Sequence, residues 1–308
     1  MLKKTLISNK YRYNINNIKH DENQYLNLID DILDENEEFV GRNGKTYAIF
    51  GSVMHYDLVD NVVPFLTTKK LAWKTCLREL LWFIKGDTSN KKLKEKNVHI
   101  WDLNGNREFL DSRGLTHYNE DDLGPIYGFQ WRHFNAEYSS CDDNYTNKGI
   151  DQLKFIIDQL KNPETRNSRR LIMTAWNPCQ INEMALPPCH ILCQFNVLNG
   201  NKLSCALYQR SGDVGLGIPF NIASYSLLTH LIAHHCGLVA YEFIHYLGNT
   251  HIYDDHVDGL KIQKERTPYI FPKLKITKTC KNIEDYNEND FEIMYYNFYD
   301  NINLLMRQ

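Results

Sequence analysis

Two strand patterns joined by a tight turn constrain the fold of this chain more than any other feature. The segment HILCQFNVL covers residues 190–198, and KLSCALYQRS covers residues 202–211. Between them, Asn-Gly-Asn at 199–201 is a strong hairpin signal, because Asn and Gly tolerate the positive φ angles that tight hairpin turns require. The pattern therefore predicts two antiparallel strands, and with them a β-sheet.

Four other segments show the apolar spacing that is typical of helices. They are residues 21–33, 72–86, 150–161 and 221–238. The second and the fourth carry a glycine near the end of the pattern, which is a common helix stop. The fourth is mostly apolar, and this favours a helix that is buried on more than one side.

Weaker signals fill the rest of the chain. Strands are predicted within 41–51, 58–70 and 168–176, where apolar residues are bounded by glycine, proline or polar turns. The Asn- and Asp-rich stretches 103–122 and 135–149 are interpreted as insertions on the surface.

The order of these elements favours a single domain. The sequence contains no repeat, and glycine and proline nowhere cluster into a linker. We therefore predict one α+β domain over residues 21–308. Residues 1–20 hold five basic side chains and no acidic one, which favours a flexible N-terminal arm.

Composition excludes several classes of protein. Hydrophobic residues make up 43% and charged residues 24% of the 308, as in ordinary soluble globular chains. A formal net charge of −3 gives no basic field for nucleic acid. No apolar run approaches the roughly 20 residues of a membrane span. Together with the absence of a recognisable export signal, this predicts a cytoplasmic protein that needs neither membrane nor nucleic acid.

The eight cysteines are scattered, without a C-x-x-C pair. Disulfide frameworks are typical of short secreted chains, and zinc sites of closely spaced Cys or His. We therefore expect reduced thiols and no metal site.

Cys189 has a special position among these thiols. It directly precedes the first hairpin strand, and Arg210 lies near the end of the second. Antiparallel pairing brings these ends side by side, so the hairpin predicts a thiol next to a guanidinium. A nearby cation lowers a thiol pKa and makes the sulfur nucleophilic. A buried, inert cysteine is the commoner alternative.

Arginines at strand ends suggest an anion site. Arg169 and Arg170 precede a strand pattern and Arg210 ends one, and strand ends face the loops where ligands bind. The planar guanidinium suits phosphate, although surface ion pairs are the usual role of any single arginine. The glycines of SGDVGLG, residues 211–217, lack the spacing of a P-loop or a dinucleotide fingerprint.

Two further polar residues permit alternative interpretations. Glu79 lies beside the apolar face of the helix predicted at 72–86, where it is either a surface residue or a carboxylate used in catalysis. Asn221 opens the helix predicted at 221–238, where it is either a helix cap or an amide that pairs with a nucleobase edge. From the residues alone, a reactive thiol beside a phosphate site is predicted, but no substrate.

Five motifs together resemble the thymidylate synthase family. They are ELLWFIKGDT, LGPIYGFQWRHF, ALPPCH, LYQRSGDVGLGIPFNIASY and THIYDDH, and they follow one another in the family's order and spacing. The resemblance extends from about Asp21 to Phe291. The two polar insertions, with REFLDSRG in the first, resemble those of the eukaryotic-type enzymes.

The resemblance implies reductive methylation of dUMP to dTMP. 5,10-Methylenetetrahydrofolate would be the co-substrate, would give both carbon and hydride, and would leave as dihydrofolate. Cys189 matches the nucleophile that adds to carbon 6 of the pyrimidine, so that carbon 5 can attack the folate carbon. Covalent catalysis of this kind divides one difficult step into easier ones.

The resemblance also implies roles for individual residues. Those that would act in catalysis are Glu79, Tyr127, Cys189, His190, Arg210, Asp213 and Asn221. Those that would bind dUMP are Arg42, Arg169, Arg170, Gln209, Arg210, Ser211, Asp213, Asn221, His251 and Tyr253. Those that would bind folate are Lys69, Ile100, Trp101, Asp213, Leu216, Gly217 and Phe220.

The family's architecture is a further implication. It is a single α+β domain with a large mixed, mostly antiparallel sheet packed by helices, and the other sheet face forms a homodimer interface. Arg169 and Arg170 would serve the other subunit's site across that interface.

Three segments depart from the family pattern. The arginine loop reads RNGKT after Gly41 and is one residue shorter than usual, which affects the reach of Arg42. The sugar-binding segment carries Asn249 and Asp255 where the family has Asp and Asn. The tail YNFYDNINLLMRQ lacks the family's prolines and histidine and ends in Gln308 rather than a small or branched apolar residue. Because closure of the tail excludes water, we expect this tail to weaken folate binding or slow turnover.

Three alternative functions are less well supported by the residues. A dCMP hydroxymethylase would carry aspartate at the position of Asn221. A nucleotide- or RNA-binding protein without turnover is favoured only by the unusual tail. A Cys–His hydrolase based on Cys189 has no matching local motif.

Overall fold

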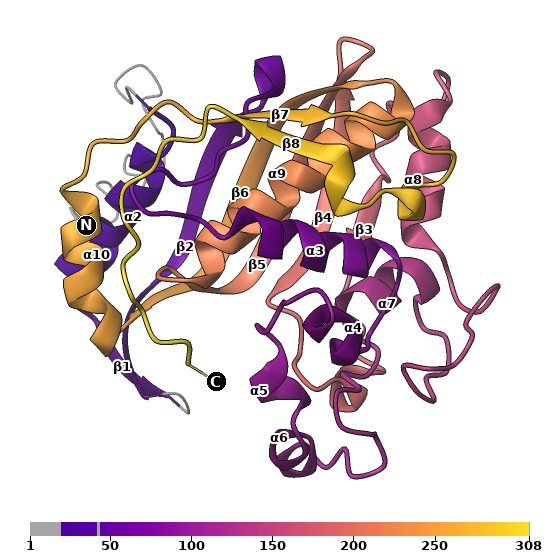
Figure 1. Cartoon of the computed structure of the whole chain (residues 1–308), viewed down its shortest axis with the longest axis horizontal. Coiled ribbons are helices and arrows are strands. Elements are labelled where there is room, and N and C mark those ends of the chain that lie inside the picture. Colours follow the sequence, from indigo (N-terminus) through magenta and orange to yellow (C-terminus); the bar gives the residue numbers. More distant parts are fainter. Residues whose placement is uncertain (1–19, 42–43, 308) are drawn as a thin grey trace, which may run out of the picture.

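A computed structural model of the chain describes residues 20–41 and 44–307 (Figure 1). The predicted N-terminal arm at 1–20, apart from His20, and the predicted phosphate ligand Arg42 lie outside these residues. The α-helices in the described ranges are α2 (Asn23–Glu35), α3 (Trp73–Ile84), α4 (Asn90–Lys94), α5 (Asp102–Gly105), α6 (Arg107–Ser112), α7 (Tyr127–His133), α8 (Gln152–Lys161), α9 (Gly217–Cys236) and α10 (Val257–Lys264).

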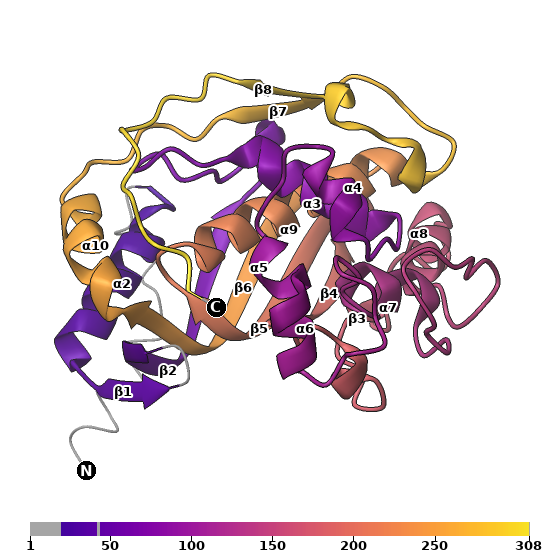
Figure 2. The ribbon, with the colours of Figure 1, turned by 60° about the horizontal axis from the view of Figure 1, so that its bottom comes forward.

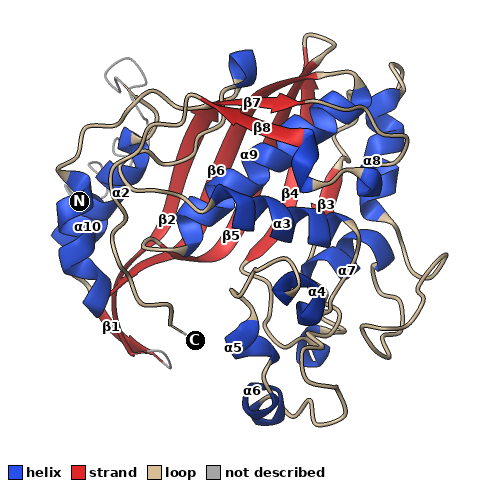
Figure 3. Ribbon diagram, in the orientation of Figure 1, coloured by secondary structure: helices blue, strands red, loops and turns tan. Residues whose placement is uncertain are grey.

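The strands in the same ranges form one large and one small sheet (Figure 3). They are β1 (Glu38–Gly41), β2 (Gly44–Asp57), β3 (Ile172–Thr174), β4 (His190–Leu198), β5 (Lys202–Asp213), β6 (Val239–Tyr253), β7 (Lys273–Ile276) and β8 (Phe291–Met294). Short 3₁₀ turns are η2 (Val59–Asn61), η3 (Ile181–Glu183), η4 (Asp254–His256), η5 (Ile283–Asp285) and η6 (Glu288–Asp290).

The large sheet has the order β1-β2-β6-β5-β4-β3, and β7 pairs with β8 in a separate ribbon. Every pairing is antiparallel except β5 with β6, which run parallel. Helix α9 connects these two parallel strands, as a parallel pair requires a crossover. The predicted α+β domain with a mixed, mostly antiparallel sheet is thereby confirmed.

One face of the sheet carries the core. Helices α9 and α3 lie in front of it, with the β7–β8 ribbon beyond (Figures 1 and 2). On β5, Leu203, Cys205 and Leu207 point into this core and are fully buried, whereas Tyr208 is 37% exposed. This alternation follows from the two-residue period of a strand. Nearly all of α9 is buried, as its apolar sequence predicts.

The opposite face of the sheet presents apolar side chains to the surface. Leu192, Tyr208, Tyr246 and Val53 lie in register across four neighbouring strands, and none of them is fully buried. Tyr246 is 45% exposed and Phe50, further along β2, is 80% exposed. A row of this kind is more apolar than the surface of a typical sheet that faces only water.

The central hairpin forms as predicted. Strands β4 and β5 pair through Phe195 and Cys205, and the turn uses Asn199 and Gly200, both with positive φ. The predicted helices at 21–33, 72–86 and 150–161 also form, as α2, α3 and α8. Gly86 ends α3 with φ of +71°.

Two predicted strands and one helix start differ from expectation. Segment 58–70 forms no strand, because Asp60 and Asn61 adopt left-handed backbone angles within η2. Only three residues of 168–176 pair, as β3. Helix α9 begins at Gly217 rather than at Asn221, and its first turn accommodates Pro219, where a missing N–H costs no helical bond.

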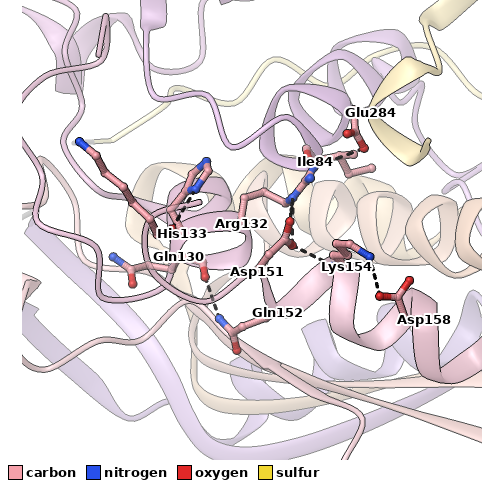
Figure 4. A network of polar contacts seen from close by, with 10 residues as sticks. Ile84, Gln130, Arg132, His133, Asp151, Gln152, Lys154, Asp158 and Glu284 are labelled. Carbon is pink, nitrogen blue, oxygen red and sulfur yellow. Dashed lines mark hydrogen bonds and ion pairs between the residues drawn. The ribbon is translucent and has the colours of Figure 1, made fainter. Parts of the chain in front are cut away.

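A charged contact fixes helix α7 against its neighbours (Figure 4). Arg132 Nε donates to both carboxylate oxygens of Asp151 at 3.1 Å, and its Nη1 donates to the Ile84 carbonyl at 2.6 Å. The same Nη1 lies 3.6 Å from Glu284 Oε2. Arg132 thus joins the end of α3, the start of α8 and η5, and so positions α7, whose first residue is Tyr127.

Among the helices of the described ranges, none combines the length and apolar character needed to cross a bilayer.

Candidate active site

A cleft of about 410 Å³ opens at the edge of the large sheet. Strands β5 and β6 end here and β4 begins here, as their parallel and antiparallel pairings require. Helices α3, α7 and α9 and the segment before α5 complete its walls. The lining side chains are Glu79, Ile100, Trp101, Asn104, Tyr127, Leu186, Cys189, His190, Gln209, Arg210, Ser211, Asp213, Gly217, Asn221, His251, Tyr253, Met306 and Arg307.

Cys189 and Arg210 meet as the hairpin predicts. The Arg210 backbone N–H donates to the Cys189 carbonyl at 2.8 Å, and Arg210 Nη2 lies 3.9 Å from the Cys189 sulfur. The guanidinium is held in place by the carbonyls of Pro188 and Pro187, to which it donates at 2.8 and 3.0 Å. The double proline thus provides acceptors that aim the cation at the thiol.

The acidity of this thiol differs from the expectation based on the hairpin. Burial raises the pKa of Cys189, although Arg210 and the Tyr127 hydroxyl both lower it. The neighbouring cation is present as predicted, but burial outweighs its effect on the thiol pKa. The sequence predicts the neighbouring cation, but the burial comes from packing by distant segments.

Glu79 projects from α3 into the cleft. Trp101 Nε1 donates to Glu79 Oε1 at 2.7 Å. Burial raises the pKa of Glu79 to about 7, and the Trp101 hydrogen bond only partly opposes this shift. A carboxyl group of that pKa exchanges protons readily near neutral pH, which suits general acid–base catalysis. The catalytic interpretation of Glu79 gains support over that of a surface residue.

Tyr127 and His190 form a stacked pair behind the thiol. Their ring centroids are 4.1 Å apart, and the Tyr127 hydroxyl accepts a 2.8 Å hydrogen bond from the Cys189 backbone N–H. His190 Nδ1 lies 2.8 Å from the Tyr225 hydroxyl. Burial lowers the pKa of His190 to about 3, so its ring is neutral. Gly128 allows α7 to approach α3, because a Cβ there would lie 2.4 Å from the Phe83 carbonyl oxygen.

Asn221 lies in the second turn of α9 and lines the cleft one turn after Gly217. Of the two alternatives for Asn221, the helix cap is wrong, because the N-cap of α9 is Leu216. No hydrogen bond from another residue in the described ranges engages the Asn221 side-chain amide. The amide is therefore available to a ligand.

The ends of β5 and β6 supply further polar groups. The Gln209 amide is used within the protein: its oxygen lies 2.8 Å from His245 Nε2, and its nitrogen donates to the Ser211 carbonyl at 2.8 Å. Asp213 accepts from the Gly215 N–H at 2.8 Å. His251 Nδ1 lies 3.0 Å from Asn249 Oδ1, and burial lowers the pKa of His251.

Several predicted ligands lie outside this cleft. Lys69 is buried and donates to the Gly215 carbonyl, and burial lowers its pKa to about 8. Leu216 and Phe220 are half-buried near the start of α9 without lining the cleft. Arg169 and Arg170 are exposed just before the edge strand β3. The assignment of these residues to folate and phosphate sites stays a prediction.

Four lining residues were not predicted. Asn104 lies in a segment without a motif, and Leu186 lies in the ALPPCH motif, where only Cys189 and His190 were predicted to act. Met306 and Arg307 come from the unusual tail, which folds back over the cleft. Their place depends on contacts with η4, some fifty residues earlier in the chain, that local sequence patterns do not reveal.

Comparison with known proteins identifies the family of the chain. Residues 23–307 match the family model described as thymidylate synthase. The chain belongs to the thymidylate synthase family. The match covers every predicted site residue, Arg42 included, and includes the tail that lines the cleft.

The relatives of this chain include bifunctional dihydrofolate reductase-thymidylate synthases and proteins named only as thymidylate synthases. It is 54% identical over 288 residues to the bifunctional dihydrofolate reductase-thymidylate synthase of Plasmodium berghei (strain Anka), and 53% identical over 289 residues to that of Paramecium tetraurelia. The matches cover 93% and 94% of this chain but 48% and 62% of those relatives. The chain thus spans about half the length of the bifunctional relatives.

A relative named only as a thymidylate synthase matches along more of its length. The thymidylate synthase of human herpesvirus 8 type P (isolate GK18) is 51% identical over 278 residues, which is 90% of this chain and 81% of the relative. Within the described part of the chain, no three His, Cys, Asp or Glu side chains are grouped so as to hold a metal ion.

Proposed function

We propose that this chain catalyses the reductive methylation of dUMP to dTMP, with 5,10-methylenetetrahydrofolate as co-substrate. The observation that carries the proposal is one cleft in which a thiol, a guanidinium, an unengaged amide and a carboxyl of pKa about 7 face one another, at Cys189, Arg210, Asn221 and Glu79. Membership of the thymidylate synthase family supports the same reaction.

The nucleotide would lie along the ends of β5 and β6. Arg210 and Ser211 would bind the phosphate, and His251 with Tyr253 the sugar hydroxyl. Asn221 would pair with the uracil edge, because an amide can donate to the ring carbonyl O4 and accept from N3–H at once. These roles follow the family's pattern, and all of these side chains line one cleft.

Cys189 would then add to carbon 6 of the ring. The sulfur forms the new bond, the C5–C6 double bond opens, and its electrons move to carbon 5 and the O4 carbonyl. The thiol must first lose its proton, which burial opposes and the phosphate-binding cation favours. Tyr127 contacts the Cys189 backbone and stacks on His190, and these two residues would orient the groups that remove the proton from carbon 5.

The co-substrate would lie against Ile100, Trp101 and Gly217, because the indole offers an aromatic face on which its rings could stack. When bound, it would supply the one-carbon unit and the hydride. Glu79, held by Trp101, would exchange protons with the pyrimidine O4 and the folate ring through water, which its pKa near neutrality allows.

The assembly that we propose is a homodimer through the open face of the large sheet. The exposed row that includes Tyr208 and Tyr246 would supply the apolar surface of such an interface. Arg169 and Arg170 are exposed at the edge of the same sheet, so they would be available to a second subunit's phosphate site.

The test is product analysis with dUMP and with dCMP. Reductive methylation yields one dihydrofolate for each dTMP, because the folate gives up a hydride. Hydroxymethylation of dCMP adds water instead and leaves tetrahydrofolate. Dihydrofolate that forms with dUMP but not with dCMP supports the proposal. Nucleotide binding by calorimetry without any turnover would overturn it in favour of a binding protein.

A further inference from the structure

The segment from Tyr299 to Arg307 runs along the molecule as a strap rather than as a helix or strand (Figures 1 and 2). The Tyr299 N–H donates to the Thr67 carbonyl at 2.8 Å, and Arg266 donates to the Asp300 carbonyl at 2.9 Å. Leu304 packs so closely on Gly259 of α10 that a Cβ there would lie 2.9 Å from its methyl group. The strap then reaches the cleft, which Met306 and Arg307 line.

Arg307 is surrounded by three elements. Its Nη2 lies 3.0 Å from Asp254 Oδ1 and 3.0 Å from Asp255 Oδ1, both on η4. Its guanidinium lies 5.7 Å from the centre of the Tyr253 ring, at the end of β6. A Cβ on Gly44, at the start of β2, would approach Arg307 Nη1 to 2.8 Å. Arg307 therefore joins the tail to η4 and to the paired ends of β2 and β6.

A second contact involves the neighbouring residue of the tail. His256 is fully buried, and its Nε2 donates to the Leu305 carbonyl at 2.7 Å. Its Nδ1 faces Asp213 Oδ1 at 3.6 Å. Asp213 itself lines the cleft. The His256 imidazole thus contacts both the tail backbone and Asp213, which is a predicted ligand of dUMP and of folate.

We propose that Arg307, Asp254 and Asp255 form a tail latch that holds residues 304–307 over the cleft, next to the start of α9 where the folate would bind. The effect of the latch on catalysis rests on the proposed function, whereas its effect on the position of the tail does not. Arg307 is a positioning residue in this account. The latch would replace the family's way of fastening the tail, since this tail and Asp255 both depart from the family sequence.

Charge argues against a direct role of Arg307 in holding an anionic ligand. Two carboxylates at 3.0 Å leave the three-residue cluster with a net charge of −1 when all are ionised. Such a cluster repels a folate carboxylate rather than attracting it. If Arg307 bound the folate carboxylate directly, removing the two aspartates would strengthen folate binding. If Arg307 acts through the latch, removing them should weaken it.

The experiment is a double-mutant cycle that uses Arg307→Ala, the pair Asp254→Asn with Asp255→Asn, and all three changes together. If the latch operates, each single arm raises KM for methylenetetrahydrofolate by about three- to twentyfold, the range expected for two half-exposed ion pairs, and leaves KM for dUMP within about twofold. The combined variant is no worse than either arm. Raising the salt concentration from about 0.05 to 0.5 M should raise this KM in the wild type, because salt screens the ion pairs, and should leave it unchanged in the variants.

Hydrogen exchange of the ligand-free protein tests whether the latch holds the tail, independently of catalysis. The amides of residues 304–307 exchange faster in either arm than in the wild type if the latch is real. The matched control is Lys275→Ala, which removes a 3.0 Å exposed ion pair with Glu292 on the β7–β8 ribbon and changes neither readout.

Two outcomes would overturn the inference. Either exchange is unchanged in both arms, or Arg307→Ala raises the folate KM while the aspartate pair does not. If the wild type shows no turnover at all, the proposed function fails, and exchange alone decides whether the latch stands.

Discussion

The Trp101 indole donates a 2.7 Å hydrogen bond to the Glu79 carboxyl inside the cleft. This contact joins α3 to the segment before α5 and stabilises the ionised form of an acid that burial would keep protonated. Because the two effects oppose each other, Glu79 titrates near neutral pH. Its behaviour in variants is therefore a sensitive test of the site.

Replacing Glu79 with glutamine should lower kcat/KM by about two to four orders of magnitude, the usual contribution of a general acid–base group. The amide of the introduced glutamine keeps an oxygen that accepts from Trp101, so the cleft geometry is preserved. Steady-state rates of dihydrofolate formation measure the effect. A loss of less than about threefold would rule out proton transfer through this residue.

The same change should stabilise the fold at alkaline pH. The folded pKa of Glu79, about 7, exceeds its ordinary value of 4.5. Below pH 4.5 the carboxyl is protonated in both the folded and the unfolded protein, so the raised pKa does not affect stability. As the pH rises from 4.5 to 7, the carboxyl ionises in the unfolded protein but stays protonated in the folded one. The resulting destabilisation of the fold grows over this range and is complete above pH 7. We expect Glu79→Gln to raise the free energy of unfolding by about 1–2 kcal/mol at pH 8, a value reduced for water in the cleft, and by almost nothing near pH 4.5. Urea titrations at the two pH values provide the comparison.

Trp101→Phe removes the donor while keeping an aromatic ring. The Glu79 carboxylate loses a stabilising hydrogen bond, so its pKa should rise further, by roughly one unit. The inflection near neutrality in the pH profile of kcat/KM should shift to higher pH by the same amount. An unshifted inflection would assign it to another group.

Cys189 should alkylate slowly at neutral pH, because burial raises its pKa above the usual value. The rate of iodoacetamide modification at Cys189, followed by peptide mass, should still be rising above about pH 9. Arg210→Gln removes the cation that lowers this pKa and should move the midpoint higher, whereas Arg210→Lys keeps the charge and should move it less. Equal midpoints in all three proteins would show that Arg210 does not act on the thiol.

Asn221→Asp should exchange the preferred base. A carboxylate accepts from the cytosine amino group but offers no donor to the uracil O4. We expect turnover of dUMP to fall by at least about a hundredfold and dCMP to become the better ligand. Competition binding of the two nucleotides measures the preference. An unchanged dUMP preference would remove Asn221 from base recognition.

Local chemistry made part of this structure predictable. The Asn199-Gly200 turn fixes the β4–β5 hairpin, and pairing within it is enough to bring Cys189 beside Arg210. Strand alternation and helical spacing likewise locate the core faces of β5 and α3. All of these depend on residues close together in sequence.

Other features depend on distant contacts. Asp60 and Asn61 end a strand pattern through backbone angles that composition alone does not dictate. Helix α9 begins at Gly217, so Asn221 lies in its second turn and lines the cleft. The tail reaches the cleft through η4 and α10, whose positions are set by the whole fold. The tail is in place over the cleft despite its lost prolines, so its expected effect on folate binding now depends on the strength of the latch.

The most direct test of the proposed reaction is the rate of dihydrofolate formation from dUMP and methylenetetrahydrofolate, measured for the wild type and for Cys189→Ser. We predict steady turnover by the wild type and a loss of at least about a thousandfold in the variant, with nucleotide binding retained. Equal rates in the two proteins would contradict covalent attack by Cys189.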